Sequence, residues 1–340
     1  MAHTTRNPFK GGSMRSMMSS TAEAPIKPKV MLITMFAPEA QTWIERLALD
    51  REIPVPGLSA QYPNILCNDR DTCLLVTGMG QTNAAASVLA LALSTQFDLR
   101  QTYFLVAGIA GINPHRGTLG TAAWARYLVE FGTQWGLDSR DAPEHWPTGY
   151  IGINTQGPDE KPPLDYQTEV FELNPALQAR AFALSRHVVL SESEESAAWR
   201  AKYPWAPANQ PPVVTRGDTA SSSTWFSGTR LGERAEAWTR LLTDNQGSYF
   251  TTQQEDNSTY EALLRASRAG RVDINRLAVV RAGSNFDRPY LGYSDVDNLL
   301  KYAEQGGFAP ALENLYRAGN PLVQAITGNW SVWEQGVPES

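Results

Sequence analysis

The sequence predicts an α/β fold built on one predominantly parallel or mixed sheet. Short apolar runs typical of buried strands alternate along the chain with longer segments of helical spacing. Glycines or polar residues cluster where the apolar runs end. The 340 residues are 42% hydrophobic and include 10 Trp and 12 Tyr, which suits a sizeable core in one large or two small domains.

The first half of the chain supplies strands and helices in alternation. The run from Lys29 to Phe36 is mostly apolar and bounded by prolines, which is typical of a fully buried strand. The Ala- and Leu-rich segment 81–95 is apolar almost all round and predicts a buried helix. The other expected elements are a helix over 40–49 and strands over 73–80, 102–111 and 120–131.

Two loops that contain proline and tryptophan interrupt the second half. The first covers 138–163, and its length favours a functional loop or an insertion; the second covers 199–212. Asn174 followed by Pro175 predicts the start of a helix over 174–185. The pattern also predicts strands over 213–218 and 276–289 and a strand that ends near Thr252, with helices over 230–242, from about 258, over 309–317 and over 321–329.

Residues 1–27 are rich in Ser, Met and Gly and lack the apolar core of a signal peptide. We interpret them as a disordered tail or a cloning remnant, and residues 28–338 as a single domain. No apolar run approaches the ~20 residues of a membrane helix, so insertion into a membrane is not expected. A cytoplasmic location is favoured for the chain as given, and an extracytoplasmic one is the alternative if a signal peptide was removed.

Charge and cysteine content exclude several classes of function. The net charge is −6 and no basic patch occurs, so nucleic acid is not an expected partner. The histidines are scattered, and Cys67 and Cys73 fit no zinc spacing, so no metal or other cofactor is expected. The two cysteines are interpreted as small buried residues, and a local disulfide is left open.

The glycine motifs do not match the common nucleotide sites. Gly78 and Gly80 lie between an expected strand and helix, but Asn83 stands where a dinucleotide-binding motif has its third glycine. We interpret this segment as a tight turn that faces a ligand. The sequence has no Walker A motif and no GxSxG motif, which disfavours a Walker-type nucleotide site and a serine hydrolase.

Polar side chains follow several expected strands, where open α/β sheets bind their ligands. Each has an ordinary structural alternative. Glu39 suits the first turn of a helix, Asp218 could cap a turn, and a residue of 256–257 could cap the next helix. Asn285 and Asp287 could be turn residues. Their shared position at strand ends favours one ligand site.

The order of these motifs closely resembles the purine nucleoside permease family of fungi and bacteria. The segments QEDN at 254–257 and GSNFDRP at 283–289 carry most of the likeness, which runs from about 30 to 337. That family resembles the nucleoside phosphorylase and nucleosidase superfamily. The resemblance implies a three-layer α/β/α sandwich around a twisted mixed sheet, and it leaves a homo-oligomer open. It also implies cleavage of the bond between ribose and base in a purine nucleoside, with water or phosphate as co-substrate.

The resemblance also implies roles for the motif residues. Glu39 would orient or deprotonate the attacking water, and Asn285 would face N7 of the base. Because an amide cannot transfer a proton at neutral pH, Asp287, two residues further on, is a candidate for a substitute acid. Glu255 would bind the ribose hydroxyls. The rest of the expected substrate site is Gly108, Gly111, Asp218, Trp225, Gln254 and Ser284, with Trp225 or Phe226 stacked on the base.

Two positions favour hydrolysis over phosphorolysis. Where phosphorylases of the superfamily grip phosphate with an arginine and a serine, this chain has Val106 and Ile109. The loss of a charged donor and a hydroxyl would cost an anion site several kcal/mol, at ~1.5–3 kcal/mol for each charge-assisted bond. Hydrolysis is therefore expected unless Arg116, Arg126 or Arg281 supplies the grip. The alternatives are phosphorolysis and non-catalytic nucleoside binding in support of uptake.

Overall fold

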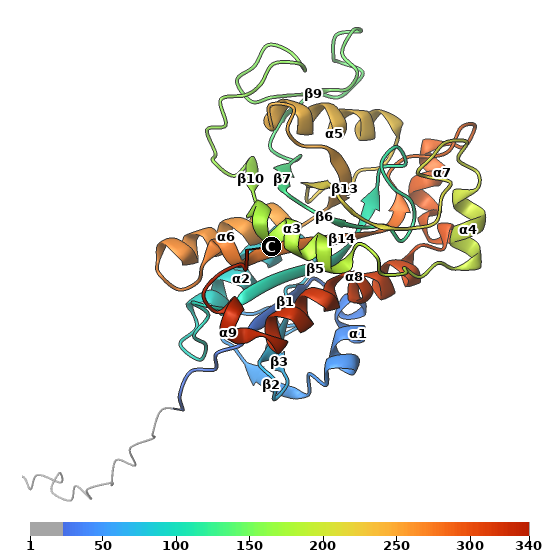
Figure 1. The fold of residues 1–340 in the computed structure, drawn as a ribbon. Helices are drawn as coiled ribbons and strands as arrows, with labels where there is room; N and C mark the ends of the chain where they lie inside the picture. The colour runs from blue at the N-terminus through green and yellow to red at the C-terminus, as the bar shows by residue number, and fades with distance from the viewer. Residues whose placement is uncertain (1–22, 340) are drawn as a thin grey trace, which may run out of the picture.

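The structure, a computed structural model, describes residues 23–339 (Figure 1). The prediction for the N-terminal tail therefore falls, for residues 1–22, outside the described residues. The strands are β1 (Val30–Thr34), β2 (Arg51–Pro54), β3 (Asn64–Cys67), β4 (Thr72–Val76), β5 (Tyr103–Ile112), β6 (Ala122–Trp124), β7 (Tyr127–Glu130), β8 (Trp135–Gly136), β9 (Tyr150–Ile151), β10 (Val170–Glu172), β11 (Val214–Arg216), β12 (Asp218–Ser221), β13 (Tyr249–Gln253) and β14 (Leu277–Phe286). The helices are α1 (Ala37–Leu47), α2 (Gln81–Leu93), α3 (Pro175–Ser185), α4 (Glu194–Arg200), α5 (Thr229–Leu242), α6 (Asp256–Arg268), α7 (Asp295–Leu300), α8 (Phe308–Gly328) and α9 (Trp330–Trp333), with 3-10 turns η1 (Ile274–Arg276) and η2 (Tyr302–Gln305).

One mixed sheet organises the chain. Its main order is β10-β7-β12-β13-β5-β1-β4-β3-β2, and β14 pairs with both β5 and β6. β1 is parallel to β4 and β5, and β14 is parallel to β5. In contrast, β13 meets the end of β5 in antiparallel fashion, through Thr251 opposite Ile112 and Thr252 opposite Gly111. The carboxyl end of β13 therefore lies beside Gly111, near the carboxyl end of β5.

Helices cover both faces of this sheet, as the alternation along β1 shows. Val30 and Leu32 belong to the core cluster that includes residues of α1, α3 and α8. Met31 and Ile33 belong to the cluster that includes residues of α2 and α6. Figure 1 shows α2 beside α6, and α8 beside α1 and α3. The expected three-layer α/β/α sandwich with a mixed sheet is confirmed.

The segment expected as one strand over 120–131 forms two strands. β6 pairs with β11 and β14, whereas β7 pairs with β10 and β12. The break between them is stabilised by Asp218, which is far away in the sequence. Its carboxylate accepts the backbone N–H of Arg126 at 3.0 Å and of Tyr127 at 2.7 Å. Because this contact joins residues so far apart in the sequence, the local sequence did not indicate the break.

The two helices expected over 309–317 and 321–329 are one helix, α8, with Pro321 inside it. An internal proline removes a backbone hydrogen bond and costs ~3 kcal/mol or more in a helix. The buried face of α8, which includes Leu315, Leu322 and Ile326, packs into the core cluster on the sheet. Burial of several large apolar side chains, at ~1.5–3 kcal/mol each, offsets the proline.

The strands β2 and β3 were not expected from the sequence. β3 pairs with β4, and a disulfide joins Cys67 and Cys73 where these two residues lie opposite each other. Both cysteines are buried, as expected, and the alternative that the sequence left open is the one found. The cross-link fixes the hairpin at this edge of the sheet.

Candidate functional site

A cavity of about 810 Å³ opens where several strands end, a size within the ~300–1,000 Å³ typical of small-molecule sites. Its inner wall consists of residues at or just after the carboxyl ends of β1, β4, β12, β13 and β14, together with Ile109 of β5. These inner residues are Met35, Phe36, Glu39, Met79, Trp225, Gln253, Gln254, Glu255, Ser284 and Asn285. The outer wall is formed by Leu299, Leu300, Tyr302, Ala303 and Phe308 of α7, η2 and α8.

Glu39 enters the cavity from the first turn of α1. β1 ends at Thr34, and Pro38 lies in the first turn of the helix that follows. The carboxylate accepts the backbone N–H of Met35 at 2.7 Å and of Ile109 at 2.9 Å. Burial raises its pKa to about 8, and the charge of Glu255 adds to the rise, while Arg281 and the two N–H donors oppose it. Glu39 can therefore gain or lose a proton near neutral pH.

Glu255 reaches the same cavity from the start of α6. Its side chain is 5% exposed, and one carboxylate oxygen accepts the backbone N–H of Gln254 at 3.0 Å. Burial raises its pKa to about 7, and Asp256 contributes to the rise while Arg281 lowers it. The side chain makes no capping hydrogen bond to α6. Its remaining acceptor capacity is available to a ligand.

The N-terminus of α6 is capped from outside the helix. Gln253 Oε1 accepts the backbone N–H of Glu255 at 2.7 Å and of Asp256 at 2.9 Å. Ser221 Oγ accepts the N–H of Asn257 at 3.1 Å. The expectation that Asp256 or Asn257 caps this helix is therefore wrong, because side chains at the ends of β12 and β13 already bond those N–H groups.

Asp256 instead forms a buried ion pair with Arg281 of β14. The carboxylate receives Nε of Arg281 at 3.0 Å and also bonds Nη2, while Nη1 donates to the carbonyl of Ile109 at 2.9 Å. Of the other arginines considered for a phosphate grip, Arg126 pairs with Glu172. Arg116 lines a separate pocket beside Tyr249. The structure does not bring Arg116 or Arg126 to the cavity, and it commits Arg281 to Asp256.

Ser284 and Asn285 lie at an irregularity of β14, where its register on β5 shifts. The Ser284 hydroxyl is 3.1 Å from Asn285 Oδ1, and Asn285 Nδ2 donates to the carbonyl of Phe286 at 3.2 Å. An amide NH₂ has two N–H groups, so one remains for a ligand. Trp225 faces this corner, whereas Phe226 is buried in a separate core cluster against Phe131.

The two expected glycines provide room under the site. A Cβ on Gly111 would come within 3.6 Å of both Asn285 Nδ2 and the ring of Trp225. A Cβ on Gly108 would collide with the side chains of Met35 and Arg281. Gly111 thus lies beneath the corner formed by Asn285 and Trp225, and Gly108 makes space for the guanidinium of Arg281.

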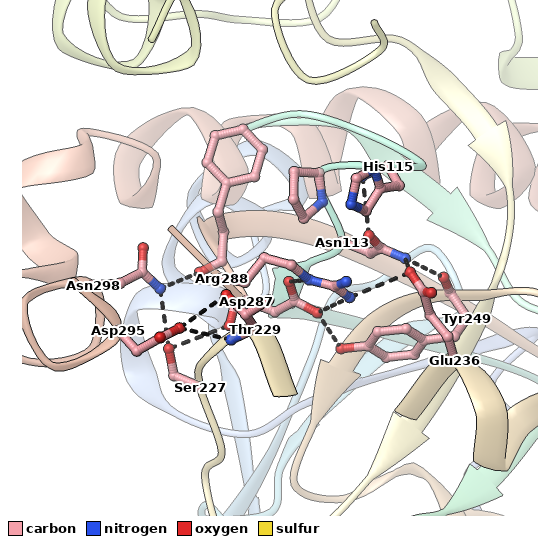
Figure 2. A network of polar contacts seen from close by, with 12 residues as sticks. Asn113, His115, Ser227, Thr229, Glu236, Tyr249, Asp287, Arg288, Asp295 and Asn298 are labelled. Carbon is pink, nitrogen blue, oxygen red and sulfur yellow. Dashed lines mark hydrogen bonds and ion pairs between the residues drawn. The ribbon is translucent and has the colours of Figure 1, made fainter. Parts of the chain in front are cut away.

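Asp287 does not reach the cavity, so the proposed substitute acid needs correction. Its carboxylate pairs with Arg288, whose Nε lies at 2.8 Å, and accepts the hydroxyl of Tyr249 at 2.8 Å. Figure 2 shows Asp287 between these two partners, with Arg288 continuing to Glu236 at 3.4 Å. The carboxylate is 1% exposed. Its bonding capacity is used within the protein, which leaves no acid at this position for a base.

Asp218 is the second expected residue that the structure places elsewhere. The chain was expected to end a strand there, but β11 ends at Arg216 and Asp218 begins β12. The carboxylate bonds backbone N–H groups of Arg126, Tyr127 and Ser248. Because the ligand end of β12 is its carboxyl end, near Ser221, Asp218 lies at the opposite end and has a structural role.

Several residues of the cavity were absent from the expected site. Gln253 stands one position before the expected pair, and its place at a strand end was the available signal. Phe36 likewise follows a strand, whereas Met79 lies in the turn between Gly78 and Gly80 that was expected to face a ligand. The outer wall from α7 and η2 had no recognisable motif, because its residues are ordinary apolar side chains on short helices. The outer-wall residues that the sequence did not indicate are Leu299, Leu300, Tyr302, Ala303 and Phe308.

Comparison with known proteins gives a consistent picture at the level of sequence. The family model described as "Purine nucleoside permease (NUP)" matches residues 27–338. The chain is 39% identical to a probable purine nucleoside permease of Schizosaccharomyces pombe, over 90% of this chain and 91% of that protein. It is 37% identical to a purine nucleoside permease of Candida albicans, over 91% of this chain and 78% of that protein.

Among solved structures, the chain is similar to the 5′-methylthioadenosine/S-adenosylhomocysteine nucleosidase of Helicobacter pylori. The TM-score is 0.53 at 13% sequence identity, with 89% of this chain and 98% of the other covered. At that identity the likeness establishes a shared fold, that of the nucleoside phosphorylase-like proteins. Across residues 23–339, none of the helices has the length and apolar character needed to span a membrane.

Proposed function

The chain belongs to the purine nucleoside permease family, and from this membership and the cavity we propose that it hydrolyses the N-glycosidic bond of purine nucleosides. The observation that carries the proposal is the convergence of two buried carboxyls, Glu39 and Glu255, beside the amide of Asn285 in one cavity. A binding pocket alone would need one of these carboxyls. The fold shared with a nucleosidase of Helicobacter pylori adds support.

In this proposal Glu255 holds the sugar. An ionised carboxylate accepts hydrogen bonds but donates none, which suits the 2′ and 3′ hydroxyls of ribose. Trp225 provides an aromatic face for the purine, and the free N–H of Asn285 bonds N7. As the base leaves, negative charge develops on the purine, so the bond to N7 strengthens in the transition state.

Glu39 positions and deprotonates the attacking water. The water oxygen bonds to C1′ while the C1′–N9 bond breaks, and the electron pair leaves with the purine. Glu39 takes the proton of the water, and the purine is protonated by solvent because the Asn285 amide holds no transferable proton. A carboxylate whose pKa is about 8 is a stronger base than an ordinary glutamate, which suits this role near neutral pH.

The direct test is to incubate the protein with inosine, guanosine and adenosine, with and without phosphate, and to measure free base by chromatography. We expect base and free ribose in phosphate-free buffer. Release that requires phosphate would replace hydrolysis by phosphorolysis. As a control for contaminating activity, Glu39→Gln prepared in the same way should release base at least about 100-fold more slowly.

A second candidate function is nucleoside binding in support of uptake, without turnover. The observation that favours it is that the relatives in Schizosaccharomyces pombe and Candida albicans are called purine nucleoside permeases. Calorimetry separates the two candidates. Tight nucleoside binding with no base release in either buffer, and unchanged by Glu39→Gln, would favour the binding function over the hydrolase.

A further inference from the structure

We propose that Asp256 is the residue that restricts this site to water, because its carboxylate neutralises Arg281 and so excludes phosphate and similar anions from the cavity. The inference deepens the proposed function, on which it rests for the identity of the acceptor. Anion binding to the cavity can be measured whether or not the protein turns over a nucleoside.

The first support is the charge of the cavity. Over residues 23–339, its lining includes the carboxyls of Glu39 and Glu255 but no lysine, arginine or histidine. A phosphate in the cavity would therefore meet two acidic groups and no cation of the wall. An anion site of ordinary affinity needs charge-assisted donors. The nearest cation able to supply them is behind the wall.

That cation is Arg281, and its charge acts on both cavity carboxyls. It is the largest charged influence that lowers the pKa of both Glu39 and Glu255. Its Nη1 bonds the carbonyl of Ile109, the residue whose N–H bonds Glu39. Only one residue of β5 thus separates the guanidinium from Glu39.

The Asp256 carboxylate binds the side of this guanidinium that carries Nε and Nη2. Two oxygens of the carboxylate take Nε and Nη2 of Arg281, and Gln253 Oε1 lies 3.4 Å from Nη2. Both partners are buried, with 1% of each exposed. A planar fork held on a carboxylate in this way cannot also grip a phosphate, whose recognition uses the same pair of donors.

The position of Asp256 shows which role its carboxylate has. It is the first residue of α6, directly after Glu255, and its N–H is already capped by Gln253. The carboxylate is therefore not needed to cap the helix. Its role in the structure is to balance the charge of Arg281, so its removal would leave a buried cation beside the cavity.

The test is Asp256→Asn, which keeps the side-chain volume and removes the charge. We expect phosphate to raise the thermal midpoint of this variant relative to chloride at equal ionic strength, by on the order of 3–5 °C at a hundred times its Kd. The wild type should show no such difference. Phosphate binding to the variant should also be visible by calorimetry without any nucleoside.

Two matched controls identify the source of the effect. The double variant Asp256→Asn/Arg281→Met lacks both charges and should be insensitive to phosphate. Asp287→Asn breaks the other buried aspartate–arginine pair, away from the cavity, and should gain no comparable phosphate effect. Phosphate stabilisation of the wild type, or a folded Asp256→Asn that gains none, would overturn the proposal.

Loss of an ionic partner in the interior can unfold a protein, so recovery is itself a measurement. If Asp256→Asn is obtained folded only when phosphate or sulfate is present, the anion has replaced the missing carboxylate and the proposal is supported. If it is not recovered in either buffer, the wild type decides: a phosphate-specific shift there contradicts the proposal, and its absence agrees with it. A wild type that releases no base would refute the hydrolase without affecting this result.

Discussion

At the scale of single residues, two buried carboxyls line a cavity whose wall, within the part of the chain that the structure describes, carries no cation, and this makes the site sensitive to pH. Glu39 and Glu255 owe their raised pKa values mainly to burial, and the charge of Glu255 raises the pKa of Glu39 further. Arg281 opposes both shifts, but it is paired with Asp256. Because the two carboxyls interact, the pKa values of about 8 and about 7 describe the pair.

Both proposed roles require the ionised carboxylate, and the ionised fraction increases with pH. We therefore expect kcat/KM for base release to rise between about pH 6 and pH 9, with its steepest part near the two pKa values. Steady-state rates over a pH series will measure this. A profile that falls over that range would reverse the assignment and make Glu39 a general acid. In Glu39→Gln the part of the rise near pH 8 should be lost, and the part near pH 7 that comes from Glu255 should remain.

Glu255→Ala should abolish nucleoside binding and leave the fold intact. The side chain caps nothing, and its pKa is higher in the folded protein than the ordinary glutamate value. Its contribution to stability is therefore present at low pH and lost as pH rises through about 7. The variant should melt at or above the wild-type temperature at pH 8, measured by calorimetry. Unfolding of the variant at that pH would show that Glu255 has a structural role instead.

At the scale of elements, the start of α6 divides its tasks among consecutive residues. Gln253 caps the helix, Glu255 faces the cavity, Asp256 pairs with Arg281, and Asn257 bonds Ser221 and the backbone of Leu128. The polar density of this turn is therefore larger than one helix cap requires. Three of these four side chains form contacts with other strands.

Gln253→Ala should destabilise the protein by ~2–4 kcal/mol. It leaves two backbone N–H groups without their acceptor and removes donors to Thr219 and Ser221 inside the protein. Urea unfolding will measure the change. The matched control is Gln254→Ala, whose side chain is less buried and bonds the carbonyl of Ser223, and which should cost less than about 1 kcal/mol. Equal losses in both variants would contradict this account of the cap.

At the scale of the whole molecule, the cavity depends on the antiparallel pairing of β13 with the end of β5. That antiparallel contact at Gly111 and Ile112 brings Gln253 and Glu255 to the ends of β1 and β14, where Glu39 and Asn285 lie. On the outer wall, Leu300 of α7 is 71% exposed. The strands β1, β13 and β14, which come from different parts of the chain, are therefore all needed to form one site.

The sequence by itself determined an α/β fold and the strand ends that carry Glu39, Glu255 and Asn285, because strand and helix periodicity and short motifs are local properties. The order of the motifs indicated the family, and the resemblance to that family implied the three α/β/α layers. The tertiary structure decided which polar side chains have capacity left for a ligand. Asp287 and Asp218 stand in equally suggestive motifs, yet partners far away in the chain bind both carboxylates. Those partners approach only when the sheet assembles, so no local pattern could separate these two aspartates from the carboxyls that line the cavity.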